Sequence, residues 1–139
     1  MNRKQIILIA ASVLALVVVI LVIWWVFQPA SKTVQKEKPA YTMEASELVQ
    51  EFETDEAMAN SLYLDKIIQV GGTIDNISED ETILLVTLKD PGSLSGTICS
   101  FNKSTVLDKQ FEVGSRIEIK GICDGYLMDV ILTRCALIE

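Results

Sequence analysis

The pattern of hydrophobic and polar positions divides this chain into three parts. Residues 6–27 form an uninterrupted run of 22 residues without a charge. A helix of that length measures roughly 33 Å, slightly more than the ~30 Å hydrocarbon core of a bilayer. We therefore predict a single transmembrane helix at 6–27, behind a short basic head at 1–5. A cleaved signal peptide is the alternative, but the run is longer than a usual signal core and no small-residue cleavage site follows it.

The second part is polar and then amphipathic. Residues 28–40 contain two prolines, three lysines and one sizeable apolar residue, Val34, so they cannot bury enough surface to fold and are predicted to be a flexible linker. Between residues 42 and 65 the apolar positions recur at helical spacing. The pattern predicts two short helices that pack on a sheet. The repeating positions are Ala45, Leu48, Val49 and Phe52, and then Met58, Ala59, Leu62 and Tyr63.

From residue 66 the period becomes two, which is typical of strands. Five strands are predicted, at 66–74, 82–88, 96–101, 116–123 and 128–138. Glycines inside the first and fourth of these, Gly71, Gly72 and Gly121, suit the sharply coiled strands of a small closed barrel. The predicted fold class is thus mainly β with N-terminal helices (α+β). Its simplest architecture is a five-stranded OB-fold barrel in a domain at 41–139, behind the transmembrane helix.

Two segments then carry a family resemblance. Residues 59–74, ANSLYLDKIIQVGGTI, and residues 120–132, KGICDGYLMDVIL, resemble the opening and closing segments of the tRNA-anti-like OB-fold family, together with Ile98-Cys99-Ser100-Phe101. The resemblance covers about residues 46–139. It implies a small bacterial OB domain attached to the membrane or envelope, often as a lipoprotein. This chain differs in having a transmembrane run in place of a lipidated cysteine.

Charge separates the parts more sharply than the composition of the whole chain suggests. The chain has a net charge of −7, but residues 41–139 hold 18 acidic and 7 basic residues. A domain with a net charge of −11 repels polyanions and lacks the basic groove that nucleic-acid binding relies on. Nucleic acid is therefore an unfavoured partner.

Catalytic and metal-binding patterns are weak in this sequence. Histidine is absent, which excludes histidine-based nucleophilic triads and histidine metal sites. Asp75, Glu79, Asp80 and Glu81 lie in a polar segment, which is expected to be a solvated loop and not a pair of catalytic carboxylates, and the glycine of a calcium-binding EF-hand is missing. We expect no enzyme activity and no cofactor. The candidate ligand face is the barrel surface of the first three predicted strands with the loop 75–81, and its members are these four acids and Phe101.

The three cysteines are Cys99, Cys123 and Cys135. They form no CxxC motif, so neither a zinc site nor a thioredoxin-type redox site is indicated. Each lies in a predicted strand, where it is either a buried thiol or one half of a disulfide. The sequence does not determine which two would pair.

These observations predict a membrane-anchored OB-fold module that binds or scaffolds a protein, a peptide or an envelope glycan. The short head is easily left in the cytoplasm, so the N-terminus is expected inside and the domain outside, in the periplasm or the cell exterior. The alternative is a nucleic-acid-binding OB module with a cytoplasmic domain. A thiol-redox protein is a third hypothesis, disfavoured by the missing CxxC.

Overall fold

A computed structural model describes residues 1–27 and 34–138, and it divides the chain into two compact units, Met1–Lys32 and Thr33–Glu139. In the first unit, helix α1 (Arg3–Val26) covers nearly all of the predicted span, and its most apolar 18 residues have a mean hydropathy of 3.5. All of its side chains are exposed. It is long and apolar enough to cross a membrane. The predicted linker 28–40 falls in part on residues 28–33, which lie outside the described residues.

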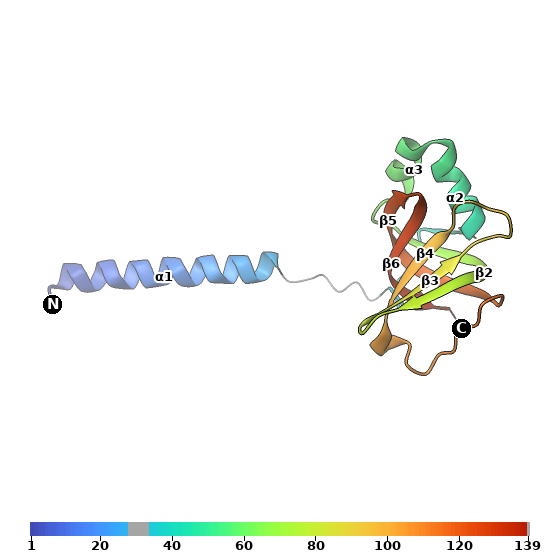
Figure 1. The fold of residues 1–139 in the computed structure, drawn as a ribbon. Helices are drawn as coiled ribbons and strands as arrows, with labels where there is room; N and C mark the ends of the chain where they lie inside the picture. Colours follow the sequence, from blue (N-terminus) through green and yellow to red (C-terminus); the bar gives the residue numbers. More distant parts are fainter. Residues whose placement is uncertain (28–33, 139) are drawn as a thin grey trace. The chain divides into compact units, whose positions relative to one another are not determined.

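The second unit is the predicted five-stranded barrel with one added strand (Figure 1). Its sheet has the order β1-β2-β3-β4-β6-β5, and β2 also pairs with β5, which closes the barrel. Only β1 with β2 and β4 with β6 pair in parallel. The predicted fold class is confirmed. The strands are β1 (Tyr41–Glu44), β2 (Ile67–Glu79), β3 (Ile83–Leu88), β4 (Thr97–Asn102), β5 (Arg116–Leu127) and β6 (Asp129–Leu137).

Two helices, α2 (Ala45–Thr54) and α3 (Glu56–Tyr63), cover one end of the barrel. Asp55 lies between them and starts α3 by accepting a hydrogen bond from the backbone N–H of Met58 at 3.0 Å. Phe52 of α2 is fully buried and stacks on Tyr126 of β5, with ring centroids 5.7 Å apart. Tyr63 adds edge contacts to the same cluster. These aromatic rings fix the helices on the barrel.

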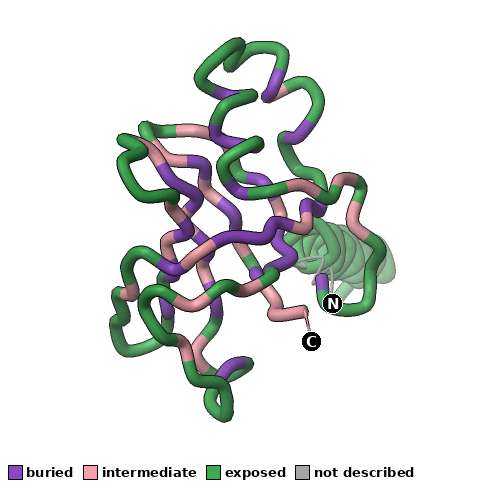
Figure 2. The backbone as a smooth tube through the Cα atoms, turned by 90° about the vertical axis from the view of Figure 1, so that its right-hand side faces the viewer, coloured by how far each residue is buried: buried purple, intermediate pink, exposed green. Residues whose placement is uncertain are grey.

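The barrel interior follows the alternation of side chains along the strands (Figure 2). On β4 the inward residues are Thr97, Cys99 and Phe101, and all three are buried. The Thr97 hydroxyl is satisfied because it donates to the carbonyl of Ala45 at the start of α2, 3.4 Å away. The barrel and the helices thus share one core.

Residues 34–40, the second half of the predicted linker, pack on the barrel instead of forming a free coil. The Lys120 ammonium on β5 is nearly buried, and it donates to the backbone carbonyls of Gln35 and Glu37 at 3.1 and 2.7 Å. The N–H of Ala40 donates to the carbonyl of Ile67 at 2.7 Å. We call residues 34–40 the strap. The prediction missed it because its contacts, with Lys120 and Ile67, join segments that are distant in the sequence, and because its one sizeable apolar residue, Val34, is buried there.

Candidate functional site

The predicted acidic segment is a strand followed by a tight turn. Strand β2 continues through Asp75 to Glu79, and the turn consists of residues 80–82. The Asp80 carboxylate accepts hydrogen bonds from the N–H groups of Thr82 and Ile83, both at 2.8 Å, and these bonds lower its pKa. Glu79 forms an ion pair with Lys103 at 3.1 Å. The two carboxylates therefore serve the turn and its contact with the neighbouring loop.

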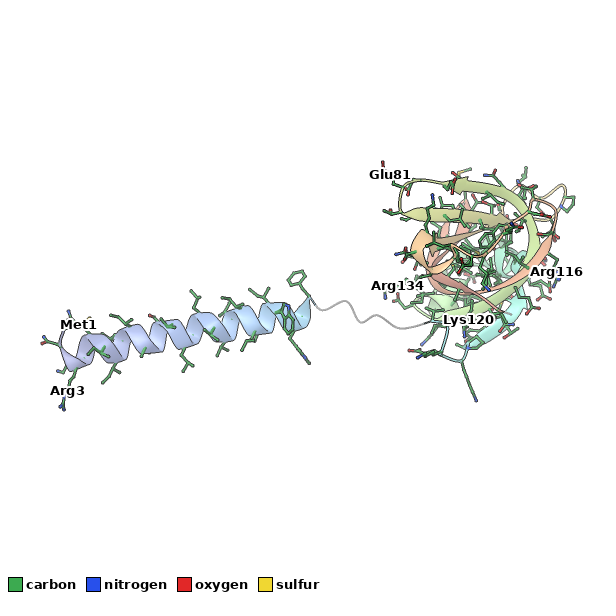
Figure 3. All side chains as sticks on the ribbon, turned by 90° about the horizontal axis from the view of Figure 1, so that it is seen from below. Met1, Arg3, Glu81, Arg116, Lys120 and Arg134 are labelled. Atoms are coloured by element: carbon green, nitrogen blue, oxygen red, sulfur yellow. The ribbon has the colours of Figure 1, made fainter. Side chains whose placement is uncertain are left out.

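The remaining members of the predicted ligand face lie apart. Asp75 and Glu81 are exposed, and Figure 3 shows Glu81 at the end of the β2–β3 hairpin. Phe101 is only 1% exposed and points into the barrel, where its ring lies 5.4 Å from that of Phe111. Phe101 is thus removed from the ligand face. The sequence does not show which side of β4 faces the core, because Ile98 and Phe101 lie on opposite sides of the strand and both are apolar.

The residues that the structure describes contain no cluster of three or more metal-ligating side chains. Among their carboxyl groups, the two with a resolved shift are Asp80 and Glu44, and both have a lowered pKa. For Glu44 the main cause is the hydrogen bonds donated by the Arg116 guanidinium, one of them at 2.9 Å. A lowered pKa keeps these groups ionised and unsuited to donate protons near neutral pH.

The cysteines separate into a pair and a single thiol, all buried and free. Cys99 and Cys123 both lie opposite Leu132, in the β4–β6 and β5–β6 registers, and the Cys135 thiol donates to the carbonyl of Leu132 at 3.4 Å, so the register alone does not separate the three. A hydrogen bond with the Cys135 thiol, together with burial, raises the pKa of Cys99, and this contact makes the two thiols a pair. Desolvation raises the pKa of Cys123, which lies near Asp65 and Asp124 instead. If one bridge forms, Cys99 and Cys135 are the two that the fold brings together.

The outer surface of β3 and β4 is an uncovered, uncharged wall. On β3, Ile83 and Leu85 point outward and are 40% and 37% exposed. Leu85 lies opposite Ser100 on β4 and Ser78 on β2. Neither β3 nor β4 contains a charged residue. The ligand face was predicted on the first three barrel strands, which are β2, β3 and β4, but with the acidic residues and Phe101 as its members. Ile83 and Leu85 were missed, although the apolar residues on both sides of the 83–88 strand were their signal.

Two clefts of about 410 Å³ lie near opposite ends of β4. The first lies between α2 and the β3–β4 loop (residues 89–96), above a floor formed by Gly72 and Leu88. Its wall is polar on the α2 side, with Ser46, Gln50 and Glu53. The second has an apolar floor that includes Leu84 and Phe111, and its rim carries Lys103 and Lys109.

No aromatic residue in the described part of the barrel unit is fully exposed. Of the six aromatic residues in the described part of the barrel unit, three are buried and three are half-buried. Each ring contacts another ring. The rings therefore act as internal packing and offer no open platform for stacking. They are Tyr41, Phe52, Tyr63, Phe101, Phe111 and Tyr126.

Comparison with solved structures agrees with the barrel topology. A proposed nucleic acid-binding lipoprotein from Klebsiella pneumoniae matches with a TM-score of 0.61 at 21% identity, over 81% of this chain and 100% of that chain. Weaker matches are the Stn1–Ten1 complex of S. pombe (TM-score 0.41, 16% identity, 52% of this chain and 58% of that chain) and yeast Stn1 and Ten1 (TM-score 0.45, 15% identity, 80% and 68%).

No curated protein matches this chain. The family comparison, in contrast, extends over almost its entire length, because the tRNA_anti-like family matches residues 1–137. The resemblance read from the opening and closing segments of the barrel is thereby confirmed. The chain belongs to the tRNA_anti-like family of OB-fold proteins.

Proposed function

We propose that this protein is a single-pass membrane protein that presents its OB-fold domain outside the cytoplasm as a binding or scaffolding module, without enzyme activity. The observation that carries the proposal is the uncovered outer β3–β4 face. Counted around the closed barrel from β2, β3 and β4 are the second and third of the five strands. The outer surface formed by these strands is where OB-folds bind their ligands.

The chemistry of this face favours a polypeptide partner. Ile83 and Leu85 supply apolar contact area, and Ser78 and Ser100 beside them supply hydroxyl groups. An uncharged apolar centre with polar neighbours matches the composition of protein interfaces. An envelope glycan is the less favoured ligand because no aromatic ring is fully exposed in the described barrel unit.

Nucleic acid is the second candidate, because the Klebsiella pneumoniae relative is named as a proposed nucleic acid-binding lipoprotein. Single-stranded nucleic acid is usually bound by aromatic platforms in a basic groove. Here the aromatic rings are engaged with each other, and β3 and β4 carry no cation. A fluorescent single-stranded oligonucleotide, titrated at physiological salt against the full chain, tests this candidate. Micromolar or tighter binding would overturn our preference.

Topology can be tested with one new thiol. The three native cysteines are buried, so a cysteine introduced at the exposed Val113 becomes the reactive group. A membrane-impermeant maleimide should label the Val113→Cys protein in intact cells. Asn2→Cys, in the short head, is the matched control and should react only after the membrane is broken. The reverse pattern would place the domain in the cytoplasm.

The ligand face can be tested by incorporating a photo-crosslinking amino acid at Leu85 or at Val113 of the full chain. Both positions are exposed, but Val113 lies in the segment that connects η1 (Lys103–Thr105) to β5. We expect a discrete protein adduct from position 85 in living cells and none of the same size from position 113. Equal adducts at both positions, or none at 85, would contradict the assignment of this face.

A further inference from the structure

A second surface, away from the outer β3–β4 face, exposes apolar side chains on two loops. Leu94 in the β3–β4 loop is 96% exposed, and Leu127 and Met128 at the end of the β5–β6 hairpin are 78% and 82% exposed. We call these three residues the apolar tip. Such exposure of large apolar side chains is unfavourable in water unless a partner covers them.

The two loops of the apolar tip are held together. The Asp129 carboxylate accepts a hydrogen bond from the N–H of Gly96 at 2.7 Å, and the N–H of Val130 donates to the carbonyl of Gly96 at 3.0 Å. A side chain at position 96 would lie 2.8 Å from the backbone carbonyl oxygen of Leu88, so glycine is required there. The loops that carry Leu94 and Leu127 are thus presented from a fixed base.

Met128 shows that the tip is not arranged for stability alone. Its φ is +64°, a left-handed conformation that glycine or asparagine adopts at lower cost. A hairpin end normally uses those residues, yet this one combines backbone strain with an exposed methionine. Strain of this kind is often retained for a functional reason.

The charges around the tip select the kind of partner. Segments 45–66, 89–96 and 124–129, which form this end of the barrel, hold nine acidic residues and two basic ones, Lys66 and Lys89. Asp90 in the β3–β4 loop and Asp124 near the end of β5 are both exposed and lie on the segments that carry the tip. Their charge opposes insertion of the tip into an anionic lipid surface, and it attracts a basic polypeptide.

We infer that the apolar tip is a docking site for a cationic, amphipathic segment of another protein, whose apolar residues cover Leu94, Leu127 and Met128. Lysines and arginines of that segment then lie against the acidic residues of α2, α3 and the two loops. This inference rests on the proposed role as a binding module, but it concerns a separate surface from the outer β3–β4 face.

The experiment uses the full chain in nanodiscs of neutral phosphatidylcholine, with a photo-crosslinking amino acid at position 127 or 107. Leu107 is a matched control because it is 77% exposed and lies beyond the other end of β4. The probe is a peptide that alternates lysine and leucine, compared with its glutamate–leucine counterpart. We expect the lysine peptide to be captured about tenfold more at 127 than at 107. A well-placed apolar anchor contributes about this factor to binding affinity.

Two variants separate docking from charge attraction and from misfolding. Met128→Asn should leave thermal stability unchanged or higher, since asparagine accepts the left-handed backbone, while it lowers capture at 127 several-fold. Asp90→Asn with Asp124→Asn should lower capture and its dependence on salt.

Equal capture at 127 and 107, or equal capture of both peptides, would overturn the inference. Adducts from 127 to anionic lipid added to the discs would assign the tip to the membrane. These capture results are independent of the Leu85 crosslinking and the topology labelling, which test the proposed function.

Discussion

The two ends of this barrel differ in how they are closed and in what they expose. At the helical end, α2 and α3 seal the barrel with Phe52, Tyr63 and Tyr126, and the apolar tip projects beside them. At the loop end, the turn 80–82 and residues 103–115 close the barrel around Phe101 and Phe111. Residues 79–82 and 103–116 hold five acidic and three basic residues.

This difference shows that the strong negative charge of the domain is not a uniform solubilising coat. It is concentrated at the helical end, where nine acidic residues face two basic ones. At the loop end Lys103 pairs with Glu79 and also donates to the carbonyl of Asp80 at 2.9 Å. The loop end therefore pairs Glu79 internally and keeps a net charge of −2, whereas the helical end has a net charge of −7.

The largest expected effect breaks the packing of the helical end. Phe52→Ala removes a buried ring that stacks on Tyr126, and we expect it to lower the free energy of unfolding by about 3–5 kcal/mol. Phe111→Ala at the loop end removes a half-buried ring and should cost only about 1–2 kcal/mol. Thermal unfolding of the full chain in detergent measures both. Equal losses would mean that both ends contribute equally to the stability of the core.

The next largest effect concerns how firmly the strap is held on the barrel. Lys120→Met keeps the apolar stem but leaves the carbonyls of Gln35 and Glu37 without their charged donor, which should cost about 1–3 kcal/mol. Because the strap leads directly into β1 and α2, hydrogen exchange should accelerate at Ala40 and in β1. Amides of β3 should keep their rates. Trypsin should also cut faster after Lys36, and an unchanged cleavage rate would show that Lys120 does not hold the strap on the barrel.

How far the sequence predicts this molecule depends on whether the information is local. Periodicity located the two helices and the five barrel strands, although β2 and β5 continue beyond the predicted ends. It missed β1, which is four residues long and pairs in parallel with residues 68–71 of β2. It also missed the strap. Both depend on contacts between distant segments, for which a run of residues gives no periodic pattern.

The candidate site was harder to predict than the fold. The acidic residues attracted attention because of their charge, but Asp80 and Glu79 serve the β2–β3 turn. The surfaces that the structure exposes are apolar, at Leu85 and at Leu127. Apolar residues in strands and hairpins are normally assigned to the core. Only the fold shows on which side of the barrel wall each of them lies.

A smaller expected effect comes from matched glycines in the two loops. Gly92 near the helical end and Gly114 at the loop end have φ values of +86° and +90°, and a Cβ at either position would meet no atom within 4 Å. Gly92→Ala and Gly114→Ala should therefore cost the same, about 1–2 kcal/mol from backbone strain. Equal decreases in melting temperature would show that the two ends differ in charge and apolar exposure and not in loop strain. Unequal decreases would contradict this.

The smallest effect is a pH dependence with a defined sign. Hydrogen bonds from Arg116 lower the pKa of Glu44 below its ordinary value of 4.5, and the N–H groups of Thr82 and Ile83 lower the pKa of Asp80 below 3.8. A carboxyl group with a lowered pKa in the folded state stabilises the fold fully above its unfolded pKa. That stability is lost as the pH falls through the lower folded value. Both groups lie at the surface, so each contribution is small.

The variants Glu44→Gln and Asp80→Ala probe the two groups separately. Glu44 joins β1 and the start of α2 to β5, whereas Asp80 belongs to the loop end. Each variant should melt slightly below the parent at pH 7, and the difference should shrink as the pH is lowered below about 4. Added salt should reduce the Glu44 difference more, because its main partner is a charged guanidinium and that of Asp80 is the backbone. A difference for Glu44→Gln that persists in acid would mean that the Arg116 contact does not depend on the carboxylate charge.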